Sequence, residues 1–222
     1  MIKAIIFDMD GLMIDSEPFH LQSFNAVLKK FGDSISESEN KRYIGLSDKD
    51  AAVDIVKQFN LPISPEELVL QKGQFYKKIL TKKVKSQAGL KSLLKSLSKK
   101  DYKLAIASGS HLDEIQTVVN KLGIADYFDV FVSSDKVKQG KPHPDIYLST
   151  ASKLLVKPEE CLVLEDAYNG LKSAKAAGMI CYVIPSNETV GQDFSTADKL
   201  FKSLKEVNTF LAKSNKPLDG WE

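Results

Sequence analysis

The chain has 222 residues, 43% of them hydrophobic, so it can bury a core and suits one domain with an insertion or two small domains. Its 31 lysines and arginines nearly balance its 29 aspartates and glutamates, and the formal charge of +2 gives no basic surface that would favour nucleic acid or an anionic membrane as a partner. The first apolar run is too short for a signal-peptide core and no later run reaches membrane-spanning length, so we expect a soluble, cytoplasmic, monomeric protein that acts on small molecules.

The first predicted element is a buried parallel strand over residues 2–7 that ends on carboxylates. Asp8 and Asp10 follow its apolar side chains directly, with Gly11 behind them. The C-terminal edge of parallel strands is where α/β folds bind ligands, and two crowded carboxylates repel unless a cation or a shared proton compensates. The structural alternative is a turn, since Asp-Gly is a common turn dipeptide. Chemistry explains two carboxylates at this position better than a turn does.

The next segment reads as helices only. Residues 18–80 carry apolar side chains at helical spacing, and residues 64–67 (Ser-Pro-Glu-Glu) form a capping box that opens a long helix. Residues 12–16 and 81–87 would then be two linkers that join this helical insertion to the rest of the chain. Because two segments that cross between modules make a hinge, we expect the insertion to move as a cap.

Beyond residue 87 helices and strands alternate. The predicted helices are 90–97, 115–122, 146–155 and 171–177, and the predicted strands are 104–107, 130–132, 162–164 and 182–184. This alternation indicates right-handed βαβ units in an α/β fold: a doubly wound, Rossmann-like parallel sheet core with an inserted α-helical cap. We expect the core at 1–15 and 84–214, the cap at 16–83 and a polar tail at 215–222. Cys161 and Cys181 read as buried thiols, because their spacing matches no zinc pattern.

Three further polar groups follow predicted strands. They are Ser108-Gly109-Ser110, Lys141-Pro142 and Glu165-Asp166. Each has a structural alternative when taken alone, namely a helix cap, a solvated lysine and another helix cap. In a parallel sheet the carboxyl ends of all strands share one edge, so we expect these groups to converge with the first two aspartates in one crevice.

That set of side chains suits phosphoryl transfer, which needs charge stabilisation and positioning. Carboxylates repel a phosphate unless a hard cation lies between them, and Mg²⁺ commonly takes one or two carboxylates plus phosphate oxygens and waters. Asp8 and Asp166 are the predicted carboxylate ligands, with Glu165 among or beside the ligands.

The remaining groups would handle the phosphate and a proton. Lys141 would supply positive charge opposite the metal, Ser108 would donate a hydrogen bond, and the backbone around Gly109 would cradle phosphate oxygens. Asp10 is then left to move a proton.

These residues closely resemble the four motifs of the haloacid dehalogenase-like (HAD) hydrolase superfamily. The resemblance extends over nearly the whole chain and includes the segments 7–12 (Phe-Asp-Met-Asp-Gly-Leu), 140–145 (Gly-Lys-Pro-His-Pro-Asp) and 164–167 (Leu-Glu-Asp-Ala). The helical insertion is similar to the small α-helical, C1-type cap of the β-phosphoglucomutase-like branch.

The resemblance implies a role for each motif residue. Asp8 would be the nucleophile that forms an aspartyl-phosphate. Asp10 would protonate the leaving oxygen and then activate water, while its backbone carbonyl ligates Mg²⁺. Asp166 would be the second metal carboxylate, and Ser108 and Lys141 would grip the phosphate.

Candidate substrate residues outside these motifs are less specific. His20 matches a histidine that couples cap closure to substrate in the mutase branch, and Lys78 falls near a substrate lysine of mutase-like caps, although each also reads as an ordinary helix-surface residue. Mutase-like sequences carry an arginine after the cap's glycine turn and a lysine and asparagine after the second motif's serines. Here the matching positions are Asp48, His111 and Leu112, and a carboxylate repels a second phosphate.

We therefore predict a Mg²⁺-dependent phosphomonoester hydrolase for a small phosphorylated metabolite, whether a sugar, polyol, nucleoside or flavin phosphate. A β-phosphoglucomutase-type sugar phosphomutase is the alternative. Dehalogenation is disfavoured because a departing halide needs no proton from Asp10. A phosphoacceptor receiver domain would be shorter, and a nucleotide-binding module would carry GxGxxG after the first strand.

Overall fold

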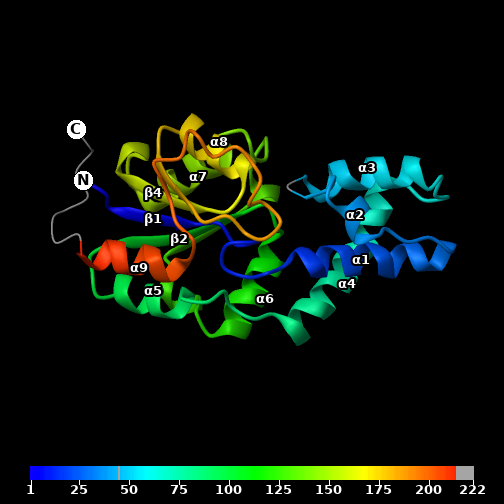
Figure 1. Ribbon diagram of the computed structural model, residues 1–222, viewed down its shortest axis with the longest axis horizontal. Helices are drawn as coiled ribbons and strands as arrows, with labels where there is room; N and C mark the ends of the chain where they lie inside the picture. Colours follow the sequence, from blue (N-terminus) through cyan, green and yellow to red (C-terminus); the bar gives the residue numbers. More distant parts are fainter. Residues whose placement is uncertain (45, 214–222) are drawn as a thin grey trace. The chain divides into compact units, whose positions relative to one another are not determined.

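The computed structural model describes residues 1–44 and 46–213, which form two compact units (Figure 1). One unit contains Met1–Asp15 and the chain from Lys85 onward, and the other is Ser16–Val84. The expected polar tail at 215–222, and Gly45 within the expected cap at 16–83, lie outside the described residues. No helix within the described ranges is both long and apolar enough to cross a membrane.

The first unit is built on a parallel sheet with the order β3-β2-β1-β4-β5-β6. Its strands are β1 (Ala4–Phe7), β2 (Lys103–Ser108), β3 (Val130–Ser133), β4 (Cys161–Glu165), β5 (Ile180–Val183) and β6 (Lys199–Leu200). In the centre, Ile6 lies opposite Ala105 of β2 on one side and Val163 of β4 on the other. Strands are added on one side of β1 up to β3 and on its other side from β4 onward, and ligands bind at the carboxyl ends beside such a switch point.

Helices cover both faces of this sheet. They are α5 (Leu90–Leu97), α6 (Leu112–Leu122), α7 (Asp145–Leu154), α8 (Tyr168–Ala176) and α9 (Leu204–Lys213), joined by the short 3-10 helices η2 (Ala125–Tyr127), η3 (Ser134–Lys136) and η4 (Pro158–Glu160). In Figure 1, α7 and α8 lie above the sheet and α5, α6 and α9 lie below it. The four residues of β1 are fully buried because neither face of the sheet is left to solvent. The predicted doubly wound α/β fold is therefore confirmed, although β6 and α9 were not expected.

The second unit is helical. It contains α1 (Glu17–Leu28), η1 (Lys29–Phe31), α2 (Glu37–Asn40), α3 (Asp48–Gln58) and α4 (Pro65–Lys83) around a core of apolar side chains that includes Phe24, Val27, Leu28, Ala52, Ile55 and Leu68. The Ser64 hydroxyl accepts a hydrogen bond from the Glu67 backbone at 3.2 Å, as a capping box requires. The Glu67 carboxylate, however, accepts from Gln71 instead of returning to the cap.

The expected linker at 81–87 begins later than predicted. Residues 81–83 are the last turn of α4, because Tyr76 and Leu80 keep that helix packed and Lys82 and Lys83 suit the negative end of its dipole. The chain then returns to the first unit at Lys85, and Ser86 forms a β-bridge with Ile14. The Gln87 backbone also donates to the carbonyl of Met13 at 2.7 Å, so the outgoing and returning segments are hydrogen-bonded to each other.

Cys161 and Cys181 are buried free thiols, as expected. They lie on the adjacent strands β4 and β5.

Candidate active site

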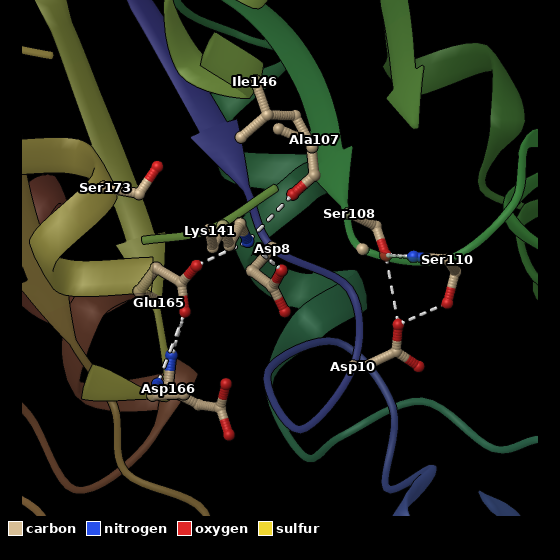
Figure 2. A network of polar contacts seen from close by, with 12 residues as sticks. Asp8, Asp10, Ala107, Ser108, Ser110, Lys141, Ile146, Glu165, Asp166 and Ser173 are labelled. Carbon is tan, nitrogen blue, oxygen red and sulfur yellow. Dashed lines mark hydrogen bonds and ion pairs between the residues drawn. The ribbon is translucent and has the colours of Figure 1, made fainter. Parts of the chain in front are cut away.

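Asp8 follows the last residue of β1 and lies at the switch point of the sheet. Its backbone N–H donates to the carbonyl of Leu164 at 3.0 Å, which continues the pairing with β4 by one residue. Its carboxylate Oδ1 accepts from the Lys141 ammonium at 2.5 Å, and the two side chains are only 8% and 14% exposed. The predicted meeting of Asp8 and Lys141 is present in the structure (Figure 2).

Glu165, the last residue of β4, is held by four protein donors. Its Oε1 accepts from Lys141 at 2.6 Å and from the hydroxyl of Tyr147 at 2.5 Å. Its Oε2 accepts from the backbone amides of Asp166 at 3.0 Å and Ala167 at 3.3 Å. Both oxygens are therefore engaged, and the Glu165 side chain is 1% exposed.

Asp166 completes a buried acidic group with Asp8 and Glu165. One carboxylate oxygen from each of the three lies within 4.8 Å of the other two. The Asp166 carboxylate lies against Gly11, whose φ of +81° and lack of a side chain are both required: a Cβ there would stand 2.1 Å from Asp166 Oδ2. The Asp-Gly turn after β1 therefore makes room for a carboxylate that comes from β4.

The acidic group is electrostatically strained. Burial raises the pKa of Asp8 well above its ordinary value, and the nearby Glu165 and Asp10 carboxylates raise it further while Lys141 opposes them. Burial also raises the pKa of Asp166, and the nearby Glu165 and Asp8 carboxylates raise it further. Burial alone would lower the pKa of Lys141, but the Asp8 and Glu165 carboxylates raise it above its ordinary value. Three buried carboxylates, two of which contact a single ammonium, form a site that a divalent cation fits.

Asp10 is held on the other side of the site by two hydroxyls. Its Oδ2 accepts from Ser108 at 3.1 Å and from Ser110 at 2.7 Å (Figure 2). The Ser108 hydroxyl also accepts from the Ser110 backbone N–H at 3.0 Å, which shapes the turn after β2, and Gly109 is exposed at that turn. Asp10, Ser108 and Gly109 therefore lie together as predicted, and Ser110 joins them.

Of the candidate substrate residues, His111 belongs to the sheet unit, and Lys78 and His20 belong to the helical unit. His111 is exposed at the start of α6, where its backbone N–H donates to Glu114 Oε2 at 3.0 Å. Lys78 is exposed on α4 with its ammonium 5.7 Å from the centre of the Phe75 ring. His20 belongs to a partly buried polar cluster in the helical unit.

That cluster is centred on Lys72, whose side chain is fully buried. The Lys72 ammonium is 2.6 Å from Asp48 Oδ2 and 2.8 Å from His20 Nδ1. It also lies 4.4 Å from the centre of the Tyr76 ring and 5.5 Å from that of Phe24. Burial alone would raise the pKa of Asp48, but Lys72 and His20 lower it well below its ordinary value.

Sequence reasoning missed two of these polar residues, Tyr147 and Lys72, and gave a third, Ser110, no role. Ser110 belongs to the group that was expected at this edge of the sheet, but the sequence alone did not predict that its hydroxyl contacts Asp10 together with that of Ser108. Tyr147 lies on the buried face of α7, and the only signal for it is that a buried tyrosine hydroxyl needs a partner. Lys72 looked like one lysine among several in a lysine-rich helix.

Comparisons with known proteins place this geometry in context. Residues 5–184 match the family described as haloacid dehalogenase-like hydrolase. Hexitol phosphatase B from Escherichia coli (strain K12) is 33% identical over 211 residues, which cover 93% of this chain and 94% of that protein. The crystal structure of CbbY from Rhodobacter sphaeroides in complex with phosphate has a TM-score of 0.87 and 27% identity, covering 93% of this chain and 96% of that one. The crystal structure of β-phosphoglucomutase from Clostridium difficile has a TM-score of 0.81 and 26% identity, covering 96% of each chain.

Proposed function

Because the chain belongs to the haloacid dehalogenase-like hydrolases, in their β-phosphoglucomutase-like branch, we propose that it hydrolyses phosphomonoesters through a covalent phosphoryl group on Asp8. It is a phosphatase of small phosphorylated metabolites, the class to which relatives such as hexitol phosphatase B belong by name. The observation that carries the proposal is the contact of Asp8 with Lys141 at 2.5 Å, beside Asp166 at the switch point of the sheet.

The acidic group is suited to Mg²⁺. We assign Asp8 and Asp166 as the carboxylates that would hold it, together with the backbone carbonyl of Asp10, and we place Glu165 beside them because both of its oxygens already accept from protein donors. A bound Mg²⁺ would neutralise charge on the carboxylates and on the phosphate oxygens, which would otherwise repel one another.

The side chains divide the reaction between them. An Asp8 oxygen attacks phosphorus, and the bond from phosphorus to the ester oxygen breaks. Asp10, aligned by its two serine hydroxyls, donates a proton to that departing oxygen and later takes one from the water that attacks the aspartyl-phosphate. Lys141 stabilises the charge that develops on the phosphoryl oxygens, and Ser108 and the backbone at Gly109 hold the phosphate.

We favour hydrolysis over mutase chemistry because of Asp48. A mutase must hold a second phosphate with a cationic group, and Asp48 stands where mutase-like sequences carry an arginine. The Asp48 carboxylate is instead the counter-charge of Lys72 at 2.6 Å. A carboxylate committed to an ion pair offers no grip to a second phosphate. Incubation with β-glucose 1-phosphate and a trace of the 1,6-bisphosphate should therefore release phosphate faster than it forms glucose 6-phosphate.

The covalent step has a direct test. Sugar, polyol, nucleoside and flavin phosphates are screened for phosphate release with Mg²⁺. The reaction with the best substrate is then quenched with hydroxylamine, which converts an aspartyl-phosphate into a hydroxamate and free phosphate. Mass spectrometry should find the hydroxamate on Asp8. Asp8→Asn should lose both label and turnover, whereas Asp126→Asn, an exposed carboxylate in η2, should keep both. Label on another residue, or turnover in Asp8→Asn, would contradict the assignment.

A further inference from the structure

A fully buried tyrosine contacts the proposed active site, and no step above uses it. Tyr147 on α7 is 0% exposed, and its hydroxyl donates to Glu165 Oε1 at 2.5 Å. The Lys141 ammonium donates to the same oxygen at 2.6 Å and lies 5.1 Å from the centre of the Tyr147 ring. Two donors therefore share one carboxylate oxygen, and one of them also contacts Asp8.

The Glu165 carboxylate has little room to change its position. Its Oε2 accepts from two consecutive backbone amides, and a Cβ on Gly170 of α8 would stand only 1.8 Å from Oε1. Only glycine therefore fits at position 170 without moving the Glu165 carboxylate. The two amides and Gly170 thus hold the carboxylate in place. Its Oε1 is left to side-chain donors, and Tyr147 and Lys141 share it.

We propose that Tyr147 is a positioning residue of the phosphatase, which aims Lys141 at Asp8 by sharing Glu165 Oε1 with it. The inference rests on the proposed function. The tyrosine hydroxyl satisfies part of the hydrogen-bonding capacity of the glutamate oxygen, so the ammonium is divided between Glu165 and Asp8. Without that hydroxyl, Glu165 draws the ammonium toward itself and away from the place where phosphoryl charge develops.

Tyr147→Phe is the test, because it removes the hydroxyl and keeps the ring. We expect kcat per folded molecule to fall about 10- to 100-fold, the usual effect of losing a group that orients an active-site side chain, while KM changes by less than about threefold. Tyr182→Phe is the matched control: it is also a buried tyrosine of the sheet unit, packed against Phe201 and Phe210, and should leave kcat unchanged. Wild-type kcat in Tyr147→Phe would overturn the inference.

A double-mutant cycle separates positioning from general destabilisation. If Tyr147 acts through Glu165, Tyr147→Phe should lower kcat by less than about twofold in a Glu165→Gln background. If Tyr147→Phe lowers kcat by the same factor in that background as in the wild type, the inference is refuted. Folding of each variant is measured by circular dichroism. If Glu165→Gln does not fold, the single Tyr147→Phe variant decides.

Crystal structures give a result that does not depend on turnover. In Tyr147→Phe the distance from Lys141 Nζ to Asp8 Oδ1 should lengthen from 2.5 Å, and an unchanged distance would refute the inference. A wild-type protein that releases no phosphate from any substrate would instead refute the proposed function, and the crystallographic comparison would still test Tyr147.

Discussion

Replacing Asp48 by asparagine should destabilise the helical unit more than replacing Lys72 by methionine. The Lys72 side chain is 0% exposed, whereas that of its partner Asp48 is 27% exposed. Asp48→Asn leaves a buried positive charge without its counter-charge, and breaking a buried pair in this way costs about 3–5 kcal/mol. Lys72→Met fills nearly the same space and leaves a carboxylate that water reaches, which costs about 1–2 kcal/mol.

Urea denaturation followed by circular dichroism measures the difference. With an m-value of about 2 kcal/mol/M, Asp48→Asn should lower the midpoint by roughly 2 M and Lys72→Met by less than about 1 M. Because the chain has two compact units, hydrogen exchange should localise both losses to α3 and α4. The double variant should recover most of the loss of Asp48→Asn, and Lys57→Met, at an exposed position of α3, should cost almost nothing.

The pH dependence has a definite sign. Since the pKa of Asp48 is lowered in the folded protein, its stabilising effect is fully present above the ordinary pKa of about 4 and is lost as pH falls through the lowered value. The stability gap between wild type and Asp48→Asn should therefore shrink below pH 4. A Lys72→Met variant that is as unstable as Asp48→Asn would show that unequal burial of the pair is not the cause. A stability difference between wild type and Asp48→Asn that widens in acid would contradict the lowered pKa of Asp48.

The other expectations concern the active site. EDTA should abolish phosphate release and added Mg²⁺ should restore it, and Asp166→Ala should need more Mg²⁺ for half-maximal rate; full activity in exhaustively chelated protein would contradict the metal assignment. Asp10→Asn should lower kcat by about 10² to 10⁴ with the fold intact by circular dichroism, and an unchanged kcat would exclude it as acid and base. Gly170→Ala should lower both thermal stability and kcat, because its methyl group would overlap the Glu165 carboxylate, and a fully active, stable variant would argue against the observed packing.

The core of the site could be predicted because it depends on topology. Apolar runs identify buried strands, parallel strands share one carboxyl edge, and residues that follow them, such as Asp8, Lys141 and Asp166, converge whatever lies between them in the chain. The pairing of Asp48 with Lys72 could not be predicted in this way, because it depends on how two helices pack after turns of unspecified geometry. The end of α4 was missed for a similar reason: residues 81–83 stay helical because of packing and end charges that composition does not reveal.

The two segments that connect the helical insertion to the sheet unit are hydrogen-bonded to each other. Ile14 bridges to Ser86 and Gln87 bonds to Met13, so the helical insertion leaves and re-enters the sheet unit at one point. A segment whose two ends are neighbours can be shortened, enlarged or exchanged without altering the register of any strand. The insertion between positions 15 and 85 can therefore be replaced as a whole, in evolution or in protein engineering, while the strands and the site carboxylates keep their sequence and register.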